Sequence, residues 1–428
     1  MTRAAVAFSL LAAAGGASAQ ERSLVIQNAR VVTVEGPTLE RGTVVITGGR
    51  IAAVGADVTP PAGATVIDAA GKTLYPGLVD GLTTLGLTEI GSVAGSVDTT
   101  EVGDVNPHAK AWVAVHPHSE LIPVARANGL TTALAAPSGG LVSGQSALVR
   151  LSGDTPESLV VKAPAAMHAV YPSGQPPFDI ARLFDEPELK TLDERLKEKK
   201  KNQEKELQRL GNLLAEAKAY GAGALAAQGT PVTPDLPMQA LAPVARGELP
   251  LVMRADAEED IRGAVAFASA HGLKLVIAGG LEAWRCADLL KQKDVAVLVG
   301  VDRLPRRRSD PYDAAYANPA ALHKAGVRFA IVTDDASQSR NLPYEAAMAR
   351  AFGLPADAAL RAITLSPAEI FGVEGRIGSI AVGKAANLFL ATGDVMDARV
   401  QVTDVFVDGV PQSMETRHTR LYKEFKDR

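Results

Sequence analysis

The sequence predicts an α/β protein in which a β/α barrel lies beside one small β domain made from both ends of the chain. Three observations support this prediction. β-type runs occur near both termini, strands and helices alternate between them, and the chain has 428 residues, whereas a β/α barrel takes about 250. Apolar residues make up 47% and charged residues 21% of the chain, which is ordinary for a globular protein and excludes wholesale disorder and collagen.

The first twenty residues, MTRAAVAFSLLAAAGGASAQ, have the pattern of a secretory signal peptide. Arg3 is followed by an apolar run over residues 4–14 and by the small-residue site Ala17-Ser18-Ala19. The apolar run is too short for a membrane anchor, which takes about 20 residues, and no later stretch is apolar for long enough to span a bilayer. We therefore expect residues 1–19 to be removed and the mature protein to be secreted or periplasmic.

The two ends of the mature chain read as β-structure. Residues 24–68 contain short β-branched runs separated by Gly, Pro and Asn turns, and the pattern returns after Ile377 in SIAVG, NLFLATG and VTDVFVDGV. Neither end alone supplies enough strands for a stable core. We therefore expect residues 20–75 and 376–428 to pair within one sheet system.

The middle of the chain, residues 76–375, alternates between strand and helix patterns. LPLVMRA precedes EEDIRGAVAFASAHG, KLVIAGG precedes LEAWRCADLLKQK, and RFAIVTD precedes PYEAAMARAFG. Such alternation indicates parallel strands joined by crossover helices. A charged insert near residues 180–220 departs from it, with eight basic and eight acidic residues over 185–209. Its zero net charge favours a solvated helix over a charged arm that binds a partner.

Charge and aromatic content indicate which kinds of partner the protein could bind. Lysine and arginine number 44 against 48 acidic residues, for a net charge of −4, and aromatic residues are only 4%. A nucleic-acid partner is therefore not expected, and we expect a small-molecule substrate or ligand; a homo-oligomer is compatible with the sequence.

The single cysteine, Cys286, excludes an internal disulfide and lies in a helical pattern, which favours packing over nucleophilic reactivity.

Several segments together carry a family resemblance. VVITGGRIAAVG, TLYPGLVDGLTTLGL, VTDD, ALRAITLSPAEIFGV and RIGSIAVGKAANLFL occur in this order, and with them the chain resembles the amidohydrolase superfamily, nearest to its imidazolonepropionase-like members. The resemblance implies a (β/α)8 TIM-like barrel with a composite β-sandwich domain. It also implies hydrolysis of non-peptide C–N bonds in amides or cyclic amides. One or two divalent metal ions, typically zinc, would lower the pKa of a bound water to about 7.

The metal-ligand positions of the family are largely changed in this chain. The resemblance implies a His-x-His pair after the first barrel strand, where this sequence has Leu82 and Thr84. The histidine region of strand five contains Arg254, and strand six ends without histidine near Gly279. The family aspartate of strand eight is matched by Asp334. Because zinc normally needs three protein ligands, we expect the family's metal site to be weak or absent.

Two side chains remain as candidates for that site. Asp334 is the candidate catalytic base and a weak metal ligand, and His168 is the nearest candidate on strand four, also as a weak metal ligand. We expect Asp334 to pair with an arginine such as Arg254, or with backbone amides. A site assembled from His116, His118 and His168 stays open as an alternative.

Arginines near the predicted barrel mouth are candidates for substrate binding. Arg303 and Arg306–Arg308 follow the strand VAVLVG, and Arg254 ends another strand. Arg254, Arg306 and Arg307 could hold a carboxylate or phosphate by paired hydrogen bonds, although a solvated loop without a ligand would have the same sequence.

Two functions remain open at this stage. One is an exported amidohydrolase that cleaves a C–N bond with Asp334 as base. The other is a non-catalytic protein of this fold that binds a small anionic ligand or a protein partner.

Overall fold

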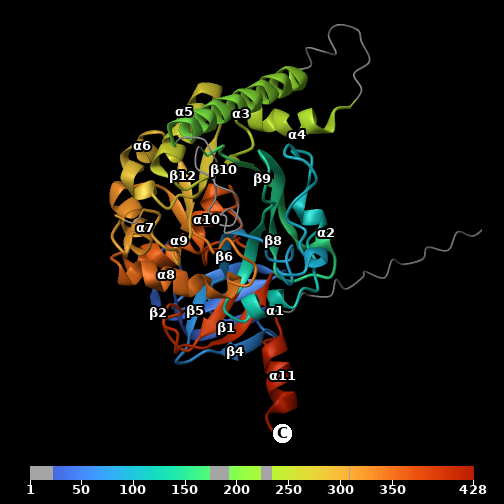
Figure 1. Cartoon of the computed structure of the whole chain (residues 1–428). Helices are drawn as coiled ribbons and strands as arrows, with labels where there is room; N and C mark the ends of the chain where they lie inside the picture. The colour runs from blue at the N-terminus through green and yellow to red at the C-terminus, as the bar shows by residue number, and fades with distance from the viewer. Residues whose placement is uncertain (1–22, 174–191, 223–233, 308) are drawn as a thin grey trace, which may run out of the picture.

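A computed structural model describes residues 23–173, 192–222, 234–307 and 309–428. The predicted signal peptide, residues 1–19, and the beginning of the charged insert, residues 180–191, lie outside the described residues. One β-sheet forms one end of the molecule, a barrel lies in the middle, and the long helix α3 crosses the other end (Figure 1). No helix in the described ranges is both long and apolar enough to cross a membrane.

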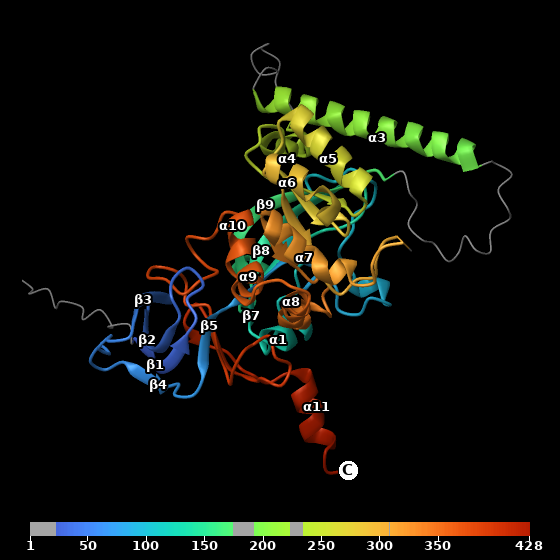
Figure 2. The same cartoon turned by 90° about the vertical axis from the view of Figure 1, so that its left-hand side faces the viewer.

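The terminal sheet combines strands from both ends of the chain. Its strand order is β16-β15-β14-β5-β1-β2-β3, with β4 paired to β1. The join lies between β5 and β14, where Tyr75 is opposite Phe389 and their rings stack 5.2 Å apart. The expected pairing of the two ends is therefore present, and this sheet stands to one side of the barrel (Figure 2). Its strands are β1 (Leu24–Val31), β2 (Leu39–Thr47), β3 (Arg50–Gly55), β4 (Thr65–Asp68), β5 (Thr73–Pro76), β14 (Leu388–Ala391), β15 (Val402–Val407) and β16 (Val410–Pro411).

A second eight-stranded sheet forms the barrel, in the order β13-β12-β11-β10-β9-β8-β7-β6. The segment that follows the edge strand β13 contacts the other edge strand, β6, through two backbone donors. The Thr333 N–H donates to the Asp80 carboxylate over 3.2 Å, and the Asp334 N–H donates to the Leu82 carbonyl over 2.9 Å. The barrel strands are β6 (Leu78–Thr83), β7 (Leu130–Ala135), β8 (Val142–Arg150), β9 (Val160–Val170), β10 (Leu251–Ala255), β11 (Leu275–Gly279), β12 (Ala296–Val299) and β13 (Phe329–Ile331).

The barrel differs from the regular (β/α)8 arrangement that we expected. β8 runs antiparallel to both β7 and β9, whereas the other neighbouring pairs are parallel. A parallel neighbour would require a crossover of a dozen or more residues, but only residues 136–141 join β7 to β8. Gly139 and Gly140 in this turn have φ of 80° and 67°, a region that favours glycine. The turn therefore reverses the chain.

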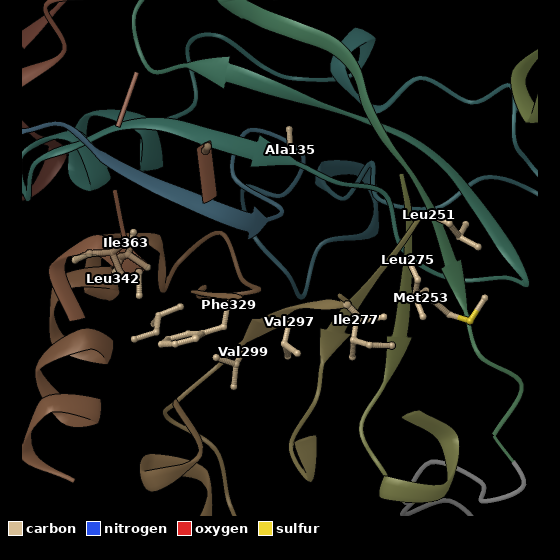
Figure 3. Close-up of a cluster of buried hydrophobic side chains, with 14 of the residues drawn as sticks. Ala135, Leu251, Met253, Leu275, Ile277, Val297, Val299, Phe329, Leu342 and Ile363 are labelled. Atoms are coloured by element: carbon tan, nitrogen blue, oxygen red, sulfur yellow. The ribbon is translucent and has the colours of Figure 1, made fainter. Parts of the chain in front are cut away.

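Helices cover the outside of the barrel, and the strands are buried on both faces. Alternate side chains such as Leu82, Val252 and Leu298 fill the barrel interior. Met253, Ile277 and Val299 belong to the outer cluster, which also contains Leu342 of a surrounding helix (Figure 3). Burial on both faces explains why the strand patterns are continuously apolar. The helices are α1 (Leu121–Arg126), α2 (Pro156–Leu159), α3 (Leu192–Gly221), α4 (Leu236–Ala245), α5 (Glu258–His271), α6 (Ala287–Gln292), α7 (Ala314–Ala325), α8 (Leu342–Ala351), α9 (Ala356–Ala362), α10 (Leu365–Ile370) and α11 (Arg417–Phe425).

The charged insert contains the 30-residue helix α3. The described side chains of its first half are mostly exposed, whereas Leu210, Leu214 and Ala217 in its second half are buried in the main core. Because these three residues recur at helical spacing, they form one apolar stripe that packs against the core. The charged first half of the helix stays in solvent.

Candidate functional site

A cavity of about 220 Å³ opens at the carboxyl ends of the barrel strands, where β/α-barrel sites are built. A larger cavity of about 690 Å³ lies at the opposite end of the barrel, beside α9 and α10. We take the smaller cavity as the candidate site, because it is the one at the carboxyl ends of the strands. It is lined by Leu82, Thr83, Thr84, Ala136, Pro137, Ser138, Gly139, Ser143, His168, Ala169, Val170, Val252, Arg254, Ala278 and Asp334.

An ion pair between Arg254 and Asp334 lies in this cavity. Arg254 Nη2 is 2.6 Å from Asp334 Oδ1, which is the pairing expected from the sequence. Asp334 follows β13 with φ of 58°, a strained conformation for a residue other than glycine. Its N–H donates to Leu82 of β6, so the contact that closes the barrel also holds this strained residue.

The charge of Arg254 is stabilised by its surroundings. Burial lowers the pKa of Arg254, but the charge and hydrogen bond of Asp334 and the charge of Asp256 raise it above its ordinary value. Burial raises the pKa of Asp256, which the charge of Arg254 partly offsets. A fixed cation therefore lies at the mouth of the barrel.

Among the described residues, His168 is the one imidazole on the cavity lining. It lies on β9 and is 5% exposed, and its Nε2 has no hydrogen-bond partner among the described residues. Burial, together with the charge of Arg254, lowers the pKa of His168 to about 3. The side chain is therefore a neutral imidazole at physiological pH.

The residues at this site do not fit the family's metal. Across the described ranges, no group of three or more His, Cys, Asp or Glu side chains could hold a metal ion. The one family carboxylate, Asp334, is engaged by the Arg254 guanidinium, which would repel a cation. A side chain at Gly279 would place its Cβ 2.3 Å from an Asp256 oxygen, so Asp256 occupies the space that a strand-six ligand would need.

The histidine pair after β6 belongs to a separate turn. The rings of His116 and His118 are 6.1 Å apart, and His116 Nδ1 accepts the N–H of His118 over 3.1 Å. Neither residue lines the cavity that contains His168. The alternative site from three histidines is therefore not assembled in the described part of the chain.

The candidate arginines of the loop after β12 lie outside the cavity lining. Arg307 donates to both carboxylate oxygens of the buried Glu282, over 2.6 and 3.0 Å. The charge of Arg306 acts on Asp256 and Asp260. The structure thus brings Arg254, His168 and Asp334 together and leaves Arg306 and Arg307 beside them.

Sequence reasoning missed two contributions to the site. Ser138 in the short β7–β8 turn and Ser143 near the start of β8 both line the cavity, and that turn was not predicted from the sequence. The Gly-Gly pair at Gly139 and Gly140 was the signal that could have revealed it.

Cys286 is buried, and burial raises its pKa to about 11, which agrees with the packing role predicted for it.

Comparisons with known proteins give one consistent family. A model described as the amidohydrolase family matches residues 251–411. The curated protein amidohydrolase tasK of Hapsidospora irregularis is 22% identical over 385 residues, which are 82% of this chain and 37% of that protein. The chain therefore spans well under half the length of this relative.

Solved structures have the same fold. An amidohydrolase from Thermotoga maritima MSB8 superposes with a TM-score of 0.78 at 27% identity and covers 91% of this chain and 99% of its own. An adenosine deaminase from Xanthomonas campestris with bound zinc has a TM-score of 0.50 at 18% identity, covering 95% and 98% of the two chains. Together these findings indicate the amidohydrolase superfamily.

Below the cavity, the buried Asp80 predicts a pH-dependent stability. Burial raises its pKa to about 7, although hydrogen bonds from Thr333 and Leu82 oppose the rise. Because the folded-state pKa lies above the ordinary 3.8, the stability linked to the protonated carboxyl is fully present below that value and is lost as pH rises through about 7. Asp80→Asn should remove this component, since an amide does not ionise and its carbonyl oxygen can still accept the hydrogen bond that the Thr333 hydroxyl donates to Asp80.

Denaturant unfolding at about pH 5 and about pH 8 measures the effect. The difference in unfolding free energy between the two pH values should be smaller in Asp80→Asn than in the unsubstituted protein. Asp57→Asn, an exposed aspartate after β3, controls for the charge change. An equal pH dependence in the protein and in Asp80→Asn would contradict the assignment.

Proposed function

We propose that this protein binds a small anionic molecule at the barrel mouth without the family's metal centre. The Arg254–Asp334 ion pair in the cavity at the strand ends carries this proposal. A guanidinium has five N–H donors, and the only side-chain hydrogen bond of Arg254 among the described residues is to Asp334. The remaining donors match the oxygens of a carboxylate or phosphate.

The neighbouring charges narrow the class of ligand. Asp334 offers acceptor oxygens next to the Arg254 donors, and His168 is neutral. A molecule with both an acidic group and an amide N–H would match this pair, and N-acyl amino acids are the simplest of that class. The cavity of about 220 Å³ limits the ligand to a small molecule.

The second candidate function is hydrolysis of a C–N bond other than a peptide bond. It is favoured by the position of Asp334 at the end of β13, where the family has its base, and by the hydrolases among its relatives. In this case Asp334 would take the proton of the attacking water, and Arg254 would stabilise the developing negative charge on oxygen. Neither step uses a metal ion.

Calorimetric titration with N-acetylalanine and with N-acetylalaninamide tests the binding proposal. The acid should bind and the amide should not, because only the acid has a carboxylate for Arg254. Arg254→Gln should weaken binding of the acid by about tenfold or more, since a charge-assisted hydrogen bond is lost. Arg262→Gln, at an exposed arginine of α5 paired with Glu258, is the matched control.

The same samples separate the two functions. Hydrolysis would be supported if the unsubstituted protein releases acetate from N-acetylalanine and Asp334→Asn binds the compound without releasing acetate. Binding without turnover would support the ligand-binding function. Equal affinity in the protein and in Arg254→Gln would contradict both roles of the arginine.

We also propose that the protein is exported. The proposal rests on the basic residue, apolar run and small-residue site within residues 1–19. N-terminal sequencing of the protein recovered from its native host should give a chain that begins at Gln20. An intact chain in the cytoplasm would contradict export.

A further inference from the structure

A third cavity, of about 280 Å³, lies where the terminal sheet meets the barrel. Three arginines from distant segments line it. Arg50 begins β3, Arg150 ends β8, and Arg376 lies in the loop after α10. This cavity shares no lining residue with the one that contains Arg254, and it lies toward the opposite end of the barrel, since Arg150 pairs in register with Thr132 near the start of β7.

The three guanidinium groups are only partly used by the protein. Arg50 Nη1 donates to the Gly383 carbonyl over 2.9 Å, and Arg376 Nη1 donates to the Val161 carbonyl over 2.8 Å. Arg150 is paired with the carboxylate of Asp408. These are the side-chain hydrogen bonds that the three arginines make among the described residues, so most of their N–H donors have no protein acceptor there.

The cavity has an excess of positive charge. Asp408 is the one acidic side chain among its lining residues in the described part of the chain, so three arginines and one aspartate leave a formal charge of +2. The buried Arg150 Nε, moreover, has no hydrogen-bond partner among the described residues. Buried N–H groups without an acceptor are uncommon in native proteins, which indicates that the cluster is incomplete without a further acceptor.

Close backbone packing holds the turn that carries Arg50. Gly49 has φ of 75°, and a Cβ there would lie 2.8 Å from the Asp408 carbonyl oxygen. The β2–β3 turn therefore packs directly on the turn between β15 and β16, and it positions Arg50 at the cavity. The two ends of the chain thus supply one side of the cavity and the barrel supplies the other.

We propose that this cavity is a second binding site, which takes a small phosphate-bearing anion. The planar donor forks of arginine match phosphate oxygens in paired hydrogen bonds. A phosphate monoester carries about −1.5 to −2 charges near pH 7, which balances the excess of +2, whereas a single carboxylate leaves half of it uncompensated. The volume suits a small phosphorylated molecule rather than a polymer.

Calorimetric titration of the full chain with inorganic phosphate tests the proposal, and acetate serves as the monoanionic comparison. Phosphate should bind saturably and more tightly than acetate. The double variant Arg50→Gln/Arg376→Gln should weaken phosphate binding by about tenfold or more. Arg399→Gln, at an arginine whose side chain is 90% exposed and pairs with Asp397, controls for loss of positive charge and should bind as the unsubstituted protein does.

A second readout separates a ligand site from a purely structural role of the arginines. Added phosphate should raise the melting temperature of Arg254→Gln, which lacks the arginine of the barrel mouth, and it should leave that of the triple variant Arg50→Gln/Arg254→Gln/Arg376→Gln unchanged. A triple variant that melts earlier but retains the phosphate-dependent rise would overturn the proposal. Absence of saturable phosphate binding, or loss of it in Arg254→Gln alone, would also overturn it.

Discussion

The contact between the first and last strands of the barrel determines the chemistry of its mouth. The Asp334 N–H donates to Leu82 of β6, and Thr333 is hydrogen-bonded to the buried Asp80. These bonds hold Asp334 in a left-handed conformation, from which its carboxylate reaches Arg254 over 2.6 Å. Barrel closure and the formation of the site are therefore one structural event, and a change at either strand edge would disturb both.

The ion pair at the barrel mouth also bears on whether a metal ion could bind there. A unit charge 4 Å from another costs or gains about 4 kcal/mol near a protein surface, so the Arg254 guanidinium would oppose a divalent ion beside Asp334. Asp256 fills the space next to Gly279. Because fold alone does not imply function, the activity of relatives does not transfer directly to this chain.

Much of the architecture could be predicted from the sequence. The alternation of apolar strands and amphipathic helices after Leu74 indicated the barrel, and the β-branched runs at both ends indicated a shared sheet, which Tyr75 and Phe389 join. The reversed strand β8 could not be recognised from periodicity, because a strand buried on both faces has the same apolar pattern in either direction. Only the shortness of its connection to β7 distinguishes it.

The site was predictable only in part, for a related reason. The family motif located Asp334, and the arginine in place of a histidine suggested its partner Arg254. Arg254 lies within β10, whereas Arg306 and Arg307 lie in the loop after β12. Arg307 pairs with Glu282, and such pairing depends on which loops pack together. The arginine cavity between sheet and barrel was also beyond sequence reasoning, because Arg50, Arg150 and Arg376 meet only in the folded chain.

The metal content of the protein tests the central claim most directly. The account predicts far less than one zinc, iron or manganese ion per chain in protein purified without added metal, and no rise in melting temperature when zinc is added. Near-stoichiometric metal that is retained through purification and lost in Asp334→Ala would contradict it, because Asp334 would then be a metal ligand rather than the partner of Arg254.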